Sequence, residues 1–196
     1  MKPPKQQYFF INLFTSSMQL TIDKTWTLFL DRDGVINQKL ENDYVKEYDE
    51  FVFMPNVKET LQVLRKQFNR LIVVTNQQGI GKGLMTENDF MRLHWQIEAE
   101  LFSYEVKFDK VYHCPDLSSK NSPNRKPQIG MALAAKNDFP DIDFAKSIMI
   151  GDSISDMEFG KKAGMQTIFF GKQNIPSTYI DYYAENWKTV RQLFQV

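Results

Sequence analysis

Asp31 and Asp33 stand one residue apart in the segment TLFLDRDGVIN, which runs from Thr27 to Asn37. The four residues before them suit a buried strand, and a glycine follows them. Aspartate and glycine are common in turns, so the pair could belong to an ordinary turn. Carboxylates are also the ligands that a hard divalent cation prefers. The rest of the sequence has to distinguish a turn from a chemical site.

Further polar residues also follow strand-like stretches. Thr75 and Asn76 end the stretch RLIVVTN, and Asp152 comes shortly after SIMI. Arg125 and Lys126 stand just before a stretch that predicts a helix. If these strands are neighbours in a parallel sheet, their carboxyl ends open on one crevice. Residues far apart in the sequence would then lie together, which weakens the turn interpretation.

A cluster of Asp31, Asp33 and Asp152 would need a cation. Carboxylates that share a pocket repel one another, and the pKa of some of them rises unless positive charge is present. Mg²⁺ is the most suitable ion, because it accepts one or two carboxylates, backbone oxygen and water and leaves positions for a substrate phosphate. Lys126, Thr75 and free backbone N–H groups would complete an electrostatic cradle for a phosphoryl group in transfer.

The stretches that must position these residues alternate between strand and helix patterns. The strand candidates are short and apolar on both faces, which is typical of central strands in a parallel sheet. Their alternation with helices predicts an α/β fold, a doubly wound, Rossmann-like parallel sheet with helices on both faces. The strand candidates are Thr27–Leu30, Arg70–Thr75, Lys110–His113, Ser147–Ile150 and Gln166–Phe170.

Helix candidates lie between and after these strands. The first follows Asn56, with Glu59 placed to complete a capping box. The second follows Thr86 and Asp89 and has apolar residues at helical spacing. The remaining candidates cover Gln128–Asn137, Ser155–Ala163 and Trp187–Phe194.

The composition is that of a globular protein with one domain. The chain has 196 residues, enough to bury a hydrophobic core without disulfide or metal cross-links. Lys plus Arg and Asp plus Glu each total 24, so net charge provides no general attraction to nucleic acid or membranes. Cys114 is the only cysteine, which excludes an internal disulfide and fits a reducing compartment. We expect a cytoplasmic monomer that binds neither nucleic acid nor membrane.

The start of the chain differs from the rest. Lys residues precede the short apolar run YFFINLF, which covers residues 8–14. Asn12 interrupts this run and no A-x-A-like cleavage site follows, so a signal peptide is disfavoured. We expect residues 1–24 to form a disordered extension, with Met18 as the working start, and residues 25–196 to form the domain.

Four motifs occur in an order that resembles a known superfamily. DRDGVIN, VVTNQQGIGKG, RKPQIGM and MIGDSISDMEFGKKAGM resemble the ordered motifs of the haloacid dehalogenase superfamily of phosphotransferases. The resemblance extends from about Thr27 to Val196. Within it, DRDG…N, DYVKEYDEFVFMPNV and TNQQGIGKG are most similar to the branch of heptose-bisphosphate and histidinol-phosphate phosphatases. The resemblance implies a HAD-like fold and a Mg²⁺-dependent phosphatase.

The resemblance also implies roles for individual residues. Asp31 would be the nucleophile that forms an aspartyl-phosphate. Asp33 would act first as general acid and then as general base. Thr75 would donate a hydrogen bond to a phosphoryl oxygen, and Lys126 would neutralise charge. Asp152 would hold Mg²⁺ together with the Asp31 carboxylate and the backbone carbonyl of Asp33.

The resemblance assigns the substrate-binding residues less completely than the catalytic ones. Asn76, Gln77 and Arg125 stand where the family contacts substrate, although Arg125 could also be a surface arginine on a polar loop. Asp156 has two interpretations: it either orients other groups of the site or is a solvated acid in the first turn of a helix. Ser153 stands where sugar phosphatases of the family usually carry Lys or Arg, so one cationic substrate contact is absent.

The expected substrate is a small phosphorylated metabolite. Neither of the two stretches that separate the first three motifs is long enough for a large cap domain, so we expect an open pocket covered only by residues 38–54 and 115–124. The resemblance favours the 7-phosphate of a heptose bisphosphate, with histidinol phosphate next. A polynucleotide 3′-phosphatase, which shares a stretch similar to TNQxGIGxG, and a non-catalytic phosphoryl-binding protein are the alternatives.

Sugar phosphatases of this branch often hold the loop before RKP with zinc, bound by three cysteines and a histidine. Here Cys114 stands at the first ligand position, but Asp116, Ser122 and Asn124 occupy the others, and His113 is adjacent to Cys114. Two neighbouring ligands cannot close a tetrahedral site. We therefore expect no structural zinc.

Several other features predict packing rather than chemistry. The segment GIGKG, residues 79–83, fails both the P-loop and the dinucleotide-binding patterns. His94 stands beside apolar positions of a helix and is interpreted as a packing or surface residue. Trp95 and Trp187 are interpreted as packing residues rather than as platforms for bases.

Overall fold

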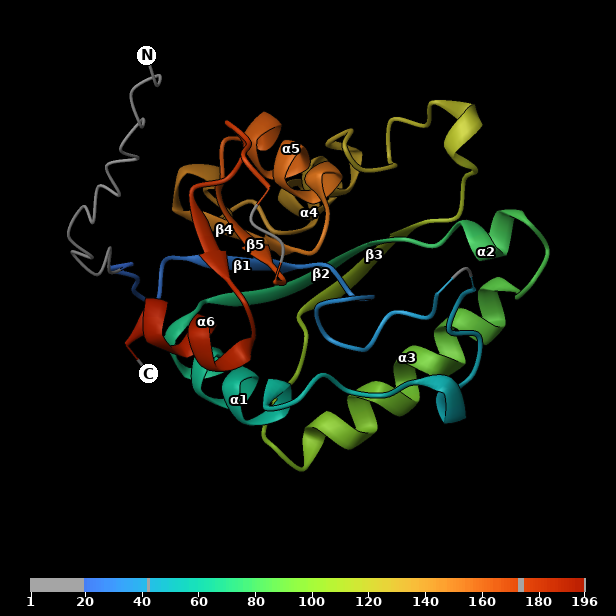
Figure 1. The fold of residues 1–196 in the computed structure, drawn as a ribbon, viewed down its shortest axis with the longest axis horizontal. Coiled ribbons are helices and arrows are strands. Elements are labelled where there is room, and N and C mark those ends of the chain that lie inside the picture. Colours follow the sequence, from blue (N-terminus) through green and yellow to red (C-terminus); the bar gives the residue numbers. More distant parts are fainter. Residues whose placement is uncertain (1–19, 42, 173–174, 196) are drawn as a thin grey trace, which may run out of the picture.

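One parallel sheet organises the protein. The computed structural model describes residues 20–41, 43–172 and 175–195. Within these residues six strands lie in the order β3-β2-β1-β4-β5-β6, and every neighbouring pair is parallel (Figure 1). The chain moves outward from β1 in one direction and then returns to β4 on its other side, so the order reverses between these two strands. In doubly wound sheets this position is where ligands bind. The strands are β1 (Thr27–Leu30), β2 (Arg70–Asn76), β3 (Lys110–Cys114), β4 (Ser147–Gly151), β5 (Gln166–Phe170) and β6 (Tyr182–Ala184).

Helices cover both faces of the sheet, as the alternation predicted. Successive side chains of a strand point to opposite faces. Leu28 and Leu30 of β1 therefore share a core with α1, α3 and α6, whereas Phe29 shares a second core with α4 and α5. Figure 1 shows α1, α3 and α6 on one side of the sheet and α4 and α5 on the other. The helices are α1 (Val57–Gln67), α2 (Gln78–Gly81), α3 (Glu87–Phe102), α4 (Gly130–Asp138), α5 (Ile154–Ala163) and α6 (Trp187–Phe194), and short 3₁₀ turns cover Tyr48–Glu50, Ser118–Lys120 and Phe144–Lys146.

The five predicted strands are confirmed to within one residue at each end. Two elements were missed, β6 and α2. β6 has only three residues at the edge of the sheet, and α2 is a single turn that contains two glycines. Neither is long enough to establish a period in the sequence. None of the helices in the described part of the chain has the length and apolar composition needed to cross a membrane.

The two predicted helix starts differ at their caps. α3 begins after Thr86 as predicted, and a capping box closes it: the Thr86 side chain accepts a hydrogen bond from the Asp89 amide, and the Asp89 carboxylate accepts one from the Thr86 amide. The box predicted at Asn56 and Glu59 is wrong. Asn56 adopts a left-handed conformation with φ of 64°, and its side chain makes no capping hydrogen bond. A capping side chain requires an extended backbone at this position, which Asn56 does not have.

The residues just before β1 contact the domain. Leu20 is only 6% exposed, and its amide donates to the Leu193 carbonyl at 3.1 Å. The Lys24 ammonium donates to the carbonyls of Arg65 and Phe68, both at 3.2 Å. The part of the predicted extension that covers residues 1–19, including the apolar run, lies outside the described residues.

Candidate active site

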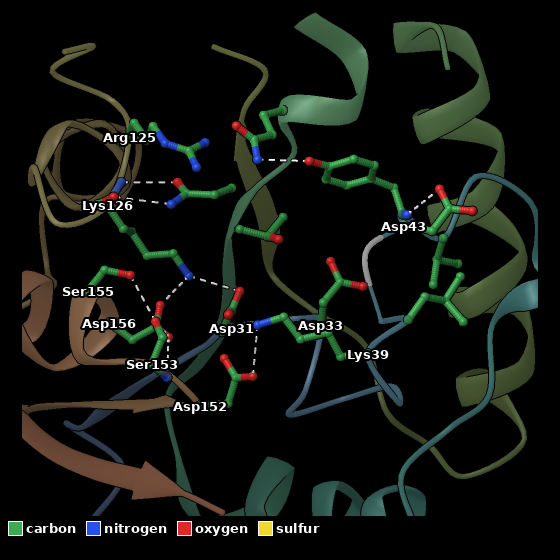
Figure 2. Close-up of a pocket in the computed structure, with 16 residues that line it drawn as sticks. Asp31, Asp33, Lys39, Asp43, Arg125, Lys126, Asp152, Ser153, Ser155 and Asp156 are labelled. Carbon is green, nitrogen blue, oxygen red and sulfur yellow. Dashed lines mark hydrogen bonds and ion pairs between the residues drawn. The ribbon is translucent and has the colours of Figure 1, made fainter. Parts of the chain in front are cut away.

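A pocket of about 260 Å³ opens at the carboxyl ends of the central strands (Figure 2). The aspartate pair follows β1, Thr75 lies near the end of β2, and Asp152 lies in the turn after β4. The sheet therefore brings together residues that are far apart in the sequence. Seven of the eight predicted site residues line this pocket. They are Asp31, Asp33, Thr75, Asn76, Arg125, Lys126 and Asp152.

Lys126 joins two carboxylates in the wall of the pocket. Its ammonium lies 2.8 Å from Asp31 Oδ1 and 2.6 Å from Asp156 Oδ1, and it donates to the Val74 carbonyl at 2.8 Å. Figure 2 shows this ammonium between the two aspartates. The Asn76 side chain holds the lysine in place, because its Oδ1 accepts from the Lys126 amide at 3.0 Å and its Nδ2 donates to the Lys126 carbonyl at 3.1 Å. Both polar groups of Asn76 are thus engaged with the backbone of Lys126.

Asp33 is held by three side chains that converge on its carboxylate. Arg32 Nη2 donates to both carboxylate oxygens, at 3.0 and 2.9 Å. Asn37 Nδ2 donates to Oδ1 at 3.0 Å, and Gln77 Nε2 donates to Oδ2 at 2.8 Å. Burial opposes ionisation of this carboxyl, but Arg32, Asn37 and Gln77 outweigh it and hold its pKa below the usual value. These contacts favour the carboxylate form of Asp33 and fix the direction in which it points.

Asp152 approaches the pocket from the turn after β4. Its Oδ2 accepts from the Lys39 ammonium at 3.1 Å, whereas its Oδ1 is buried and has no hydrogen-bond partner in the described part of the chain. Figure 2 shows Lys39 reaching Asp152 from the side opposite Lys126. Gly34 lies so close that a Cβ at this position would stand 2.1 Å from Asp152 Oδ2. The turn after β1 is thus built around the Asp152 carboxylate.

The acidic residues are arranged as a divalent cation would require. Carboxylate oxygens of Asp31, Asp152 and Asp156 all lie within 4.8 Å of one another. The unpartnered Asp152 Oδ1 gives the cluster a free acceptor, and oxygen ligands of this kind suit Mg²⁺. The donor set therefore fits Mg²⁺; its third carboxylate is Asp156, which the sequence did not assign to the metal, and the predicted backbone carbonyl ligand of Asp33 stays a prediction.

Burial and neighbouring negative charge raise the pKa of two carboxyls in the cluster. Burial raises the pKa of Asp31 to about 7; Lys126 opposes this rise, and Asp156 and Asp152 add to it. Burial and the charge of Asp156 also raise the pKa of Asp152. Lys126 behaves in the opposite way, because Asp156 and Asp31 outweigh the effect of burial and raise its pKa. The lysine therefore stays charged.

Asp156 is a buried member of the site, not a solvated acid of the first turn of α5. It is fully buried, and its Oδ2 accepts from the Ser153 amide at 3.0 Å and the Ser153 hydroxyl at 2.5 Å. Its other oxygen contacts Lys126. Asp156 thus fixes both the start of α5 and the lysine that faces Asp31.

Gln77 is the predicted substrate-contacting residue that lies outside the pocket lining. It is 1% exposed, and its Nε2 donates to both Asp33 and Thr75 Oγ1, each at 2.8 Å. Because the Thr75 oxygen accepts this bond, its own O–H remains available to the pocket. Arg125 does line the pocket, and its Nη1 donates to the Asp116 carbonyl at 3.1 Å.

Several residues that contact the site were not identified from the sequence. Arg32 and Asn37 hold Asp33, and Lys39 holds Asp152. Tyr44 lines the pocket with its hydroxyl 2.8 Å from Gln78 Nε2. The only signal for these residues was their presence inside or near the DRDG…N and TNQQGIGKG motifs. The segment 38–54 covers the pocket as predicted, but residues 115–124 contribute no lining residue.

Cys114 and His113 do not converge on one point. They are adjacent in β3 and therefore point to opposite faces of the sheet. Cys114 is fully buried in the core beneath α4 and α5, with Sγ 3.8 Å from Asp116 Oδ2 and Ser122 Oγ. His113 Nε2 instead lies 2.7 Å from Glu87 Oε2. His94, interpreted as a packing residue, is buried beside Phe90.

Comparisons with known proteins agree with this geometry. A family model described as polynucleotide kinase 3 phosphatase matches residues 27–175. The D-glycero-alpha-D-manno-heptose-1,7-bisphosphate 7-phosphatase of Campylobacter jejuni is 41% identical over 145 residues, which cover 74% of this chain and 81% of that protein. The D-glycero-beta-D-manno-heptose-1,7-bisphosphate 7-phosphatase of Escherichia coli K12 is 35% identical over 167 residues, which cover 82% of this chain and 86% of that protein.

A solved structure has the same fold. The D,D-heptose 1.7-bisphosphate phosphatase from B. bronchiseptica, complexed with magnesium and phosphate, aligns with a TM-score of 0.76 and 24% identity. The alignment covers 84% of this chain and 95% of that one. Together with the four ordered motifs, these likenesses show that the chain belongs to the haloacid dehalogenase superfamily of phosphatases, in the branch of the heptose-bisphosphate and histidinol-phosphate phosphatases.

Proposed function

We propose that this phosphatase uses Mg²⁺ and an aspartyl-phosphate intermediate to hydrolyse a sugar phosphate, and that its substrate is the 7-phosphate of a heptose 1,7-bisphosphate. The observation that carries the proposal is the pocket in which Asp31, Asp33, Lys126 and Asp152 meet at the strand ends. The two heptose-bisphosphate phosphatase relatives support the choice of substrate.

Asp31 is the nucleophile of the proposed reaction. One oxygen of its carboxylate forms a bond to phosphorus while the bond from phosphorus to the sugar oxygen breaks. Asp33 must carry a proton when substrate binds: it gives this proton to the leaving oxygen and afterwards takes one from the water that attacks the aspartyl-phosphate, which restores the acid for the next turnover. Water attack releases inorganic phosphate and restores the Asp31 carboxylate. The low pKa of Asp33 suits the second step, in which it accepts a proton.

Positive charge and hydrogen-bond donors stabilise the phosphoryl group. The Lys126 ammonium, 2.8 Å from Asp31, lies beside the oxygen that attacks and offsets the charge that gathers there. The Thr75 hydroxyl donates toward the pocket, since its oxygen already accepts from Gln77. Arg125 and Asn76 line the wall where the remainder of the substrate lies. Gln77 acts on the reaction through Asp33, because it has no access to the pocket.

The metal ligands of the proposal are the carboxylates of Asp31 and Asp152 and the backbone carbonyl of Asp33. Bound Mg²⁺ supplies charge neutralisation, so that a phosphate dianion can approach a carboxylate nucleophile. Asp156 stays engaged with Lys126 and Ser153 and so fixes the lysine rather than the substrate.

The substrate is expected to be a small metabolite and the enzyme a cytoplasmic monomer. The match to a polynucleotide 3-phosphatase family model favours a 3′-phosphorylated DNA end as the second candidate. The net charge of zero argues against it, because nucleic-acid-binding surfaces are basic. The alternative of a non-catalytic phosphoryl-binding protein is disfavoured, since both aspartates of the D-x-D pair and Asp152 are present in the pocket.

Initial rates against a panel of phosphomonoesters test the proposal. The panel contains the alpha and beta anomers of D-glycero-D-manno-heptose 1,7-bisphosphate, histidinol phosphate and 3′-phosphorylated DNA. We expect a heptose bisphosphate to have the highest kcat/KM, and EDTA to abolish turnover until Mg²⁺ is restored. Elemental analysis of the same preparation should find far less than one zinc per chain. Faster turnover of DNA ends, or full activity in EDTA, would contradict the proposal.

A further inference from the structure

Lys39 occupies an unusual position for a lysine with access to solvent. Its side chain is 59% exposed, yet its ammonium reaches into the pocket and lies 3.1 Å from Asp152 Oδ2. The backbone beside it is anchored, because the Gln38 amide donates to the Val52 carbonyl at 2.8 Å and Asn37 Nδ2 donates to the Gln38 carbonyl at 2.8 Å. The base of the side chain is therefore fixed, while its four-carbon stem can move the ammonium within the pocket.

The charges of the pocket explain why the ammonium lies against Asp152. Among the described residues, four carboxylates meet at this site and two buried cations face them, an excess of two negative charges. Asp31 and Asp156 share Lys126, whereas within the described part of the chain the one ion pair of Asp152 is with Lys39. The carboxylates are Asp31, Asp33, Asp152 and Asp156, and the buried cations are Arg32 and Lys126.

A divalent cation at Asp152 would change this balance. Two positive charges would neutralise the excess, so the ammonium of Lys39 would lose its attraction to Asp152 and be repelled by the ion. The residue after Asp152 is the uncharged Ser153, whose hydroxyl is engaged with Asp156. An ammonium released from Asp152 would then be the exposed positive charge on this side of the pocket, next to the position of a phosphate.

We propose that Lys39 is a substrate-binding residue that pairs with Asp152 when the site is free of metal and binds the phosphoryl group of the substrate when a divalent cation takes Asp152. This inference rests on the proposed function for the identity of the substrate. Lys39 thereby competes with the metal ion and cooperates with the phosphate. Removal of Lys39 should therefore strengthen the binding of the metal ion and weaken the binding of phosphate. General damage to the fold would weaken both.

Two calorimetric titrations test this role. In the first, Mg²⁺ alone is added to metal-free protein; Lys39→Met should bind it about tenfold more tightly than wild type, since a competing cation is removed. In the second, inorganic phosphate is added at saturating Mg²⁺; Lys39→Met should bind it about tenfold more weakly, since a charge-assisted hydrogen bond is lost. Lys39→Arg keeps the charge and should stay within about threefold of wild type for phosphate.

Lys82→Met is the matched control. Lys82 contacts the hydroxyl of the pocket-lining Tyr44 at 3.0 Å but does not itself line the pocket, so this variant should bind Mg²⁺ and phosphate as wild type does. Equal effects in the two lysine variants, or unchanged binding of either ion by Lys39→Met, would overturn the proposal. With substrate, Lys39→Met should raise KM and leave kcat within about threefold. The titrations need no substrate, so they decide the role of Lys39 even if the proposed substrate is wrong.

Discussion

Arg32 contacts both members of the aspartate pair. Its guanidinium Nη2 lies 3.0 and 2.9 Å from the two oxygens of Asp33, and its backbone amide donates to Asp31 Oδ1 at 2.8 Å. The side chain is 1% exposed, and its Nε and Nη1 have no hydrogen-bond partner among the residues that the structure describes. A buried guanidinium with unpaired N–H groups is costly. Its position therefore indicates that holding Asp33 is its role in the site.

Arg32→Met should impair proton transfer to the leaving group more than it impairs phosphoryl transfer. We expect hydrolysis of alkyl phosphates to fall by about 10²-fold, the contribution of a positioned general acid. Hydrolysis of p-nitrophenyl phosphate should fall much less, because nitrophenolate leaves without a proton. The measurement is the single-turnover rate of aspartyl-phosphate formation with each substrate. Circular dichroism verifies the fold, and Arg32→Lys should recover part of the loss. Equal losses on both substrates would mean that Arg32 only supports the fold.

Asp31→Asn should reduce turnover by at least ~10³-fold, because the amide cannot form the acyl phosphate. The fold should be retained, since the change removes a buried charge whose pKa is already raised by burial. Steady-state rates and thermal unfolding are the measurements. Wild-type protein quenched in acid should carry phosphate from labelled substrate in a hydroxylamine-sensitive bond, and the variant should not. Wild-type rates in the purified variant would refute the covalent mechanism.

Gly34→Ala should abolish activity by displacing Asp152, the proposed metal ligand. Gly34 has φ of +90°, and a Cβ there would stand 2.1 Å from Asp152 Oδ2. Gly83 is the matched control, because it also has positive φ, +72°, but a Cβ at this position meets nothing within 4 Å. In both variants the alanine must adopt a positive φ, which lowers the stability of the fold by roughly 1 kcal/mol. Calorimetric titration with Mg²⁺ and phosphatase rates should separate them. Similar activity in the two variants would show that the Asp152 carboxylate can move aside.

His94 should make the protein less stable in mild acid. Burial lowers its pKa to about 3, with Arg32 and His113 adding to the effect and Asp33 opposing it, whereas the unfolded chain has a value near 6.5. The unfolded state therefore binds more protons below pH 6.5, and stability falls as pH falls from 6.5 toward 3. Between pH 6.5 and 5.5 this amounts to about 1 kcal/mol.

His94→Phe should remove that contribution and keep the ring that packs on Phe90. The free energy of unfolding, measured in urea at both pH values, should fall about 1 kcal/mol more in wild type than in the variant. Parallel losses in the two proteins would show that His94 is not the responsible group.

A fragment that begins at Met18 should be soluble and as active as the full chain, because residues 1–17 contain none of the site residues. A fragment that begins at Thr25 should unfold at a lower temperature. It lacks the buried Leu20 and the two hydrogen bonds of Lys24. Thermal unfolding and initial rates compare the two fragments with the full chain. Aggregation or inactivity of the longer fragment would show that the apolar run at residues 8–14 is needed by the domain.

The layout of the fold was predictable because it depends on short-range patterns. Apolar runs such as Thr27–Leu30 and Gln166–Phe170 alternate with helical spacing, and parallel strands must bring their carboxyl ends to one edge. That constraint placed Asp31 and Asp152 in one pocket before any contact was known. The D-x-D pair, Lys126 and the order of the motifs then identified the superfamily.

The partners of the side chains were decided only by the tertiary structure. Gln77 follows the end of β2, where strand alternation no longer predicts which way a side chain points, and it lies behind Asp33 rather than in the pocket. The sequence left open whether Asp156 is solvated or buried, and it is the packing of α5 on the sheet that places it against Lys126. Lys39 reaches Asp152 across 113 positions of sequence. Local sequence determines backbone period, but burial and long-range ion pairs depend on how distant elements pack, and these set the charges of the site.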